Sequence, residues 1–110
     1  MAVSIGNKTQ ANPTPGANNH QVSHTHNTGS DGLLVVSFAM ANNRNFTSAT
    51  YGGQNMTQVF NRSLTASIFQ QRFAIYILEN PPTGSNTLRV NFNNNVFNPI
   101  SIYACSFTGA

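Results

Sequence analysis

The chain has 110 residues, which is the size of one domain. Only 6% of them are charged, five Lys or Arg against two Asp or Glu, whereas an average globular chain has roughly 25%. One Asp and one Glu leave little room for paired-carboxylate chemistry, and one Cys excludes an internal disulfide or a cysteine zinc site. The longest apolar stretch, residues 33–41, is too short to span a membrane.

The first part of the chain is extended and poor in apolar residues. Val3 and Ile5 alternate with polar residues and predict an opening strand. The segment Asn12–Asn19 contains two prolines and a glycine, which predicts a loop or an extended arm. We therefore divide the chain into an N-terminal arm, residues 1–19, and a β-domain, residues 20–110. The arm is expected to clasp a neighbouring subunit, so that its deletion leaves the fold intact.

Period-two alternation of apolar residues continues through the β-domain and predicts half-buried strands. His20, Val22, His24 and His26 share one parity and therefore one face of a strand. After a turn cluster at Thr28–Gly32, residues 33–42 predict a central strand. Its core-facing residues are expected to be Leu34, Val36, Phe38 and Met40.

The middle of the chain predicts a hairpin. Phe46–Tyr51 is a short strand, and Met56–Arg62 is expected to pair with it. Gly52 and Gly53 between them can adopt the positive φ angles that a tight turn requires.

The last third of the chain predicts three strands. Ser67–Glu79 is expected to be the longest, and Asn80–Ser85 must interrupt the ladder because its two prolines lack amide donors. Alternation then resumes at Leu88, Val90 and Phe92 and, after a turn at Asn93–Pro99, in a last strand that contains Ile100, Ile102 and Ala104.

About eight strands spaced 8–13 residues apart, with no helical pattern, predict an all-β antiparallel sandwich or barrel. Jelly-roll and Ig-like topologies both fit this spacing. We expect Phe38, Ile75, Val90 and Ile102 to lie in one core of a two-layer sandwich.

Four sequence segments resemble a family of small β-sandwich domains found in bacteriophage and bacterial surface proteins. They are HTHNTGSDGLLVVSFAM, ATYGGQNMTQV, RFAIYILENPPTGSNTLRVNF and ISIYACSFTGA. The resemblance covers residues 22–109 and rests on turn glycines, turn prolines and core strands. It implies a sandwich fold and membership among virion proteins, including capsid decoration (cement) proteins, or among modules of secreted and adhesive proteins. It implies no catalytic residue.

Few residues suggest chemistry. His24 and His26, with His20 nearby, could ligate Zn²⁺ or Ni²⁺, but a polar strand face is the simpler interpretation, since no carboxylate or Cys is nearby in sequence to complete the set. Ser30, His24 and Asp31 could be drawn as a hydrolytic triad, although no nucleophile elbow accompanies them. We expect no catalytic site, no metal and no cofactor.

The remaining candidates suggest contacts with a partner. The cations are scattered, which argues against nucleic-acid binding; they are Lys8, Arg44, Arg62, Arg72 and Arg89. Three tyrosines could stack on sugars, although burial in strands is the simpler expectation; they are Tyr51, Tyr76 and Tyr103. Cys105 is expected to be a small buried apolar residue.

Asn, Gln, Ser and Thr supply 44 of the 110 residues, so the surface is polar without being ionic. Such side chains can hydrogen-bond across an interface without the desolvation cost of ions. The expected function is that of a non-enzymatic bacteriophage capsid decoration protein on the virion surface. Its partners would be the major capsid protein and copies of itself, a trimer being one candidate, with no nucleic acid and no membrane. A carbohydrate-binding or adhesion module, associated with a tail or fibre, is the alternative.

Overall fold

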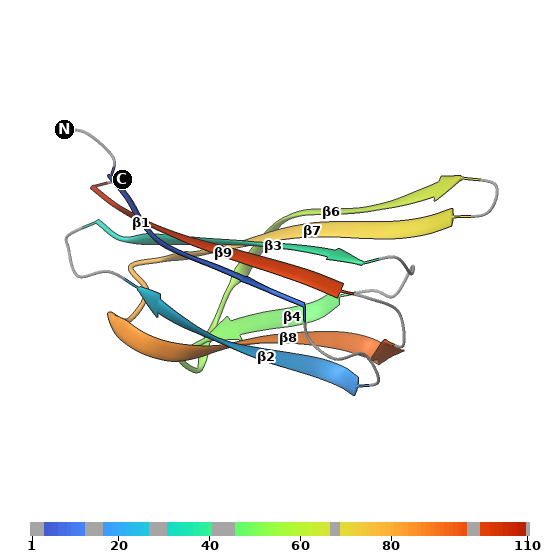
Figure 1. The fold of residues 1–110 in the computed structure, drawn as a ribbon, viewed down its shortest axis with the longest axis horizontal. Helices are drawn as coiled ribbons and strands as arrows, with labels where there is room; N and C mark the ends of the chain where they lie inside the picture. Colours follow the sequence, from blue (N-terminus) through green and yellow to red (C-terminus); the bar gives the residue numbers. More distant parts are fainter. Residues whose placement is uncertain are drawn as a thin grey trace.

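A computed structural model describes residues 4–12, 17–26, 31–40, 46–66, 69–96 and 100–109 (Figure 1). Within these ranges the chain forms nine strands and no helix. The strands are β1 Ser4–Ala11, β2 Ala17–His26, β3 Leu33–Met40, β4 Phe46–Tyr51, β5 Gln54–Asn55, β6 Thr57–Ala66, β7 Phe69–Glu79, β8 Gly84–Val96 and β9 Ile100–Thr108. The described residues include no helix of the length and apolarity needed to cross a membrane.

The strands form two antiparallel sheets that pack as a sandwich. One has the order β1-β9-β3-β7-β6 and the other the order β2-β8-β4-β5. The pairing is nested: β1 pairs with β9, β2 with β8, β3 with β7 and β4 with β5. A long hairpin wrapped upon itself gives this pattern, so the topology is a jelly roll with β6 added at one edge.

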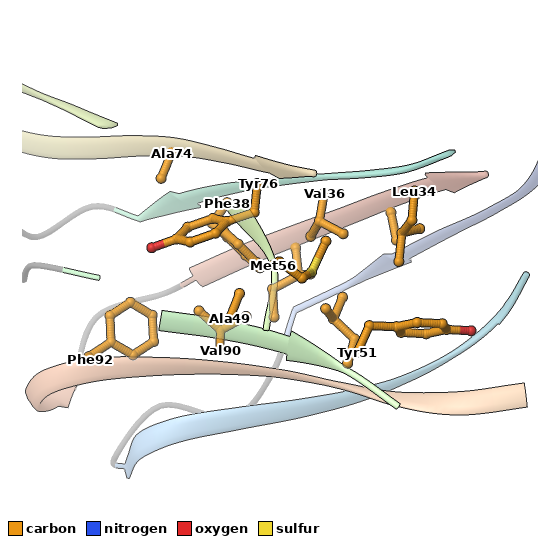
Figure 2. Close-up of a cluster of buried hydrophobic side chains, with 13 residues drawn as sticks. Leu34, Val36, Phe38, Ala49, Tyr51, Met56, Ala74, Tyr76, Val90 and Phe92 are labelled. Atoms are coloured by element: carbon orange, nitrogen blue, oxygen red, sulfur yellow. The ribbon is translucent and has the colours of Figure 1, made fainter. Parts of the chain in front are cut away.

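The core lies between the sheets (Figure 2). Leu34, Val36 and Phe38 of the central strand β3 are fully buried, as the alternation predicted. Val90 and Ile102 are also buried, from β8 and β9. Full burial of a side chain of this size stabilises the fold by about 1.5–3 kcal/mol.

The expected core position of Ile75 is wrong. Both faces of β7 are apolar, so alternation alone did not identify the buried face. The register identifies it: Phe38 lies opposite Ala74, and Ser37 lies opposite Ile75. Residues directly opposite one another share a face, so Ala74 and Tyr76 enter the core and Ile75 lies on the outer face.

Gly52 and Gly53 form the expected turn, with φ angles of 57° and 80°. The partner of Phe46–Tyr51, however, is not Met56–Arg62. After the turn only β5, two residues long, continues the hairpin with β4, whose other neighbour is β8, and the chain then crosses to the other sheet, where β6 pairs with β7. Met56 is buried at the crossing, and its amide donates to the carbonyl of Ala49 at 2.9 Å.

Two further boundaries differ from the sequence interpretation. Ser4–Ala11, part of the expected arm, pairs with β9 of the same chain, and β2 begins at Ala17. β8 is the longest strand and continues through Asn93 to Val96, where a turn was expected. Four parts of the expected elements lie outside the described residues, and they are Val3, residues 28–30 of the first turn, residues 41–45 and residues 97–99. The side chain of Met40 lies outside them too.

Candidate interaction surface and buried histidine cluster

The outer face of the five-stranded sheet is largely apolar, although Lys8, Arg62 and Glu79 also lie on it. On β3 this face carries Leu33 and Val35, which lie opposite Phe107 and Cys105 of β9. On β7 it carries Phe73, Ile75 and Ile77. All the exposed large apolar residues recorded in the structure belong to this sheet, and they are Ile5, Val59, Phe60, Phe73 and Tyr103. We call this outer face the apolar platform.

The outer face of the four-stranded sheet has the opposite character. Its described side chains are all polar, and they are Gln21, Ser23, Thr25, Ser48, Thr50, Asn55, Ser85, Thr87, Arg89 and Asn91. The amide of Asn91 donates to the hydroxyl of Ser48 at 2.9 Å across two strands. Extended apolar surface exposed on one sheet only is typical of an interaction site.

Polar side chains interrupt the core at the side of the sandwich where β1 and β2 meet. His24 is hydrogen-bonded through Nδ1 to Thr9 Oγ1 and through Nε2 to Ser106 Oγ, both at 2.7 Å. His26 is hydrogen-bonded through Nδ1 to the same Ser106 oxygen at 2.9 Å. These four residues come from β1, β2 and β9, and we call them the histidine cluster. It connects the two sheets.

The cluster is enclosed. His24 is 1% exposed, His26 is 2% exposed and Ser106 is fully buried. The hydroxyl of Tyr51 contacts the carbonyl oxygen of His24 at 2.7 Å. Gly32 provides space for one ring, because a Cβ atom at this position would lie 2.6 Å from His26 Nε2.

Burial lowers the pKa of His20, His24 and His26, and the charge of His26 lowers that of His24 further. All three rings are therefore neutral at pH 7. His20 packs edge-on against Phe92, with ring centroids 5.6 Å apart, and its buried Nε2 has no hydrogen-bond partner among the described residues.

The cluster fits a structural role better than catalysis or metal binding. Ser106 and His24 have the spacing of a nucleophile and its base, but the fully buried hydroxyl cannot meet a substrate. The structure brings together the sequence candidates His24 and His26, yet both nitrogens of His24 are occupied by hydroxyl groups. In the described parts of the chain, no group of three or more His, Cys, Asp or Glu could hold a metal ion.

Of the hypothetical triad, Ser30 lies outside the described residues, and His24 is buried with its two ring nitrogens bonded to the hydroxyl groups of Thr9 and Ser106. Asp31 is exposed, with a φ of 53°. Two residues of the cluster, Ser106 and Thr9, were not among the candidates expected from the sequence. Ser106 was detectable as a polar residue on the same parity as the buried Ile102 and Ala104.

The three tyrosines and Cys105 differ in how much of each side chain is exposed. Tyr51 and Tyr76 are buried, and Gln58 donates to the Tyr76 hydroxyl at 2.7 Å, whereas Tyr103 is 44% exposed on the apolar platform. Cys105 is only half-buried, because it too faces outward on β9.

The cations do not gather into one patch among the described residues. Lys8, Arg62 and Arg89 are exposed on three different strands, and Arg72 donates to Asn61 Oδ1 at 2.6 Å. Arg44 lies outside the described residues.

Comparison with protein-family models, curated proteins and solved structures found no match to this chain.

Proposed function

We propose that this chain is a non-enzymatic virion protein that decorates the outer surface of a bacteriophage capsid and stabilises the shell. The observation that carries the proposal is the apolar platform, a broad outer sheet face with Ile5, Phe73 and Tyr103 open to a partner. Jelly rolls are common in viral capsid proteins, and the sequence segments described above resemble those of decoration proteins. Fold alone does not determine function, so the surface is the test.

The mechanism follows from mass action. A protein that binds the assembled shell and not its free subunits stabilises the shell, and the stabilisation grows with the ratio of its free concentration to its Kd. Contacts repeated over the lattice add avidity. The platform contributes apolar burial, and polar residues on the same face, such as Gln10 and Ser101, contribute hydrogen bonds, so we expect attachment to depend little on ion pairs.

The experiment titrates purified protein onto virus particles stripped of it, at low salt and at 1 M NaCl. Salt at 1 M shortens the Debye length to about 3 Å, and apolar attachment should persist there or tighten. Phe73→Gln should weaken binding at least about tenfold, or about 1.4 kcal/mol. The matched control is Thr87→Gln, which changes an exposed residue on the opposite outer face.

Two outcomes would count against the proposal. A tenfold loss of affinity in high salt would show that the cations dominate attachment. Equal binding by the Phe73→Gln variant and the parent protein would show that the platform is not the attachment surface.

A carbohydrate-binding module is the second candidate, because Tyr103 is exposed beside amide groups. Gln10 lies opposite Tyr103 in the ladder, and its Nε2 donates to Asn12 Oδ1 at 3.1 Å. An exposed ring bordered by amides can stack on a sugar and hydrogen-bond its hydroxyls. Glycan-array binding that is lost in Tyr103→Ala and kept in Phe73→Gln would favour this function over the first.

A further inference from the structure

The four sheet edges of the sandwich are protected unequally. β1 and β2, the edges on one side, lie beside each other, and Asn7 Nδ2 of β1 donates to the carbonyl of Thr25 at 2.9 Å. Register shifts interrupt both of these strands. On the other side, β5 is only two residues long, but β6 extends over ten. An edge strand offers a row of backbone donors and acceptors to any second strand.

β6 has few of the usual features that prevent edge pairing. It contains no Lys and no Pro, and Arg62 is its single charge. Its register against β7 shifts once, between Gln58 and Phe60, and is regular from Phe60 to Ala66. Val59 and Phe60 are 54% and 41% exposed.

The regular part of β6 also extends beyond the body of the sandwich. β3 ends at Met40 opposite Arg72, while β6 and β7 continue as a two-stranded hairpin to the pair Ala66–Phe69. Figure 1 shows this hairpin projecting past the neighbouring strands. A second strand can therefore approach the edge of β6 without meeting the rest of the molecule.

We propose that β6 pairs antiparallel with β6 of a second copy of this chain, which joins the two five-stranded sheets into one. Residues directly opposite in a ladder share a face, so a twofold pairing centred on a residue keeps both apolar platforms on the same side. Using the whole regular stretch, Phe60 to Ala66, places the twofold axis at Ser63.

This register also keeps like charges apart. It sets Arg62 of each copy opposite Leu64 of the other, whereas a pairing centred one residue earlier would set two arginines opposite each other. The alternative partner for the β6 edge is an unrelated extended segment, whose pairing with β6 would have no twofold axis. Val59 and Phe60 of β6 are exposed apolar residues. A second copy would bring the same residues to the paired edge and extend the apolar surface across it, which favours a copy of this chain over an unrelated segment.

The pairing deepens the proposed function, since a doubled platform would bind a shell with two linked footprints. It gives a dimer in place of the trimer considered from the sequence. The pairing itself is measured on free protein, so its failure leaves shell binding by single copies open, and failure of shell binding leaves the dimer intact.

The first experiment is sedimentation velocity over a concentration series. The parent protein should dimerise, and Ser63→Lys should weaken dimerisation at least about tenfold because two lysines meet on the axis. Ser63→Glu should do the same, and an equimolar mixture of the two variants should recover association. Ser23→Lys, an exposed serine on edge strand β2, is the matched control and should dimerise like the parent.

Several results would overturn the proposal. One is a parent protein that remains monomeric up to about 1 mM, because its free energy of association would then be smaller than about 4 kcal/mol in magnitude. Alternatively, Ser63→Lys could dimerise as well as Ser23→Lys does, or the mixture could fail to recover association. Circular dichroism of each variant shows whether it is folded, and the recovery arm distinguishes lost pairing from lost folding.

The second experiment tests the register with disulfides. In a Cys105→Ser background, Ser63→Cys should form a dimer linked across the axis under mild oxidation. Thr65→Cys should not, because its two copies would lie four positions apart in the paired strands. Efficient linking by Thr65→Cys and not by Ser63→Cys would overturn the proposed register.

Discussion

The two long sides of the sandwich are constructed in opposite ways. Where β1 and β2 meet, the side is closed by hydrogen bonds between the sheets, from Asn7 and Thr9 to β2 and from Ser106 to both buried histidines. Where β6 forms the edge, the strand is ten residues long, and its own residues Val59 and Phe60 are exposed. A chain with few ions has few charges with which to protect its edges; it closes one side with a buried polar network and leaves the edge of β6 open.

The largest expected effect comes from deleting the closed side. Removal of residues 1–12 eliminates the ladder of β1 with β9 and leaves His24 Nδ1 without Thr9. We expect the free energy of unfolding to fall by more than about 3 kcal/mol, measured by urea denaturation, since a buried polar group left unpaired costs about 1–3 kcal/mol in addition to the ladder. This revises the sequence-based expectation that the arm is dispensable for folding.

The matched deletion lies on the open side. Among the described residues, 64–66 pair only with 69–71, so replacing residues 64–71 with an Asn-Gly turn should cost less than about 1 kcal/mol. Comparable losses from the two deletions would remove the distinction between the sides.

Ser106→Ala should have the next largest effect. It removes the one oxygen that His24 and His26 share and leaves two buried ring nitrogens unpaired. The expected cost is about 2–4 kcal/mol of unfolding free energy. Ser23→Ala, at an exposed position, should stay within about 0.5 kcal/mol of the parent. Similar values for the two variants would mean that the cluster does not hold the closed side together.

Acid should weaken the closed side selectively. The pKa values of His20, His24 and His26 are lowered by burial from the usual 6.5, so the unfolded chain binds more protons than the folded chain below that pH. Stability is therefore complete above about pH 6.5 and is lost as the pH falls from there toward the folded pKa values. Urea midpoints at pH 7.5 and 5.5 measure this loss. The variant His26→Asn should show a smaller loss, and an unchanged slope would argue against the cluster as its source.

Asn7→Ala should have the smallest effect. Its hydrogen bond to the Thr25 carbonyl is exposed, and such bonds contribute about 0.5–1.5 kcal/mol at most. We expect a loss below about 1 kcal/mol, together with faster amide exchange along β1. Asn55→Ala, at an exposed position on β5, is the control. Faster exchange in both variants would indicate a general effect of losing an asparagine.

Local pattern predicted much of the fold. The burial of Leu34, Val36 and Phe38, and the turn at Gly52–Gly53, follow from alternation and from glycine stereochemistry. The face of Ile75 could not be predicted, because β7 is apolar on both sides and only its register with β3 decides which side is covered. The change of sheet after β5 depends on packing between distant segments, which leaves no local signal.

The functional features were less accessible from the sequence. Shared parity placed the histidines on one face, but the partner that joins them, Ser106, is about eighty residues away in sequence. The apolar platform was concealed by the same two-sided strands that misplaced Ile75. Two signals carry more weight in such chains. One is a polar residue that alternates in step with buried residues, and the other is an apolar residue that alternates in step with exposed ones.

The shared hydroxyl of Ser106 also restricts where protons can reside. It has a single proton, so within the chain from Thr9 to His26 it donates to one ring and accepts from the other. If Ser106 donates to His26, both imidazoles carry their proton on Nε2; if it donates to His24, both carry it on Nδ1. The two rings are thus locked in the same tautomer, and one can exchange only when the other does. Nitrogen chemical shifts of the two histidines should accordingly report one collective tautomeric state.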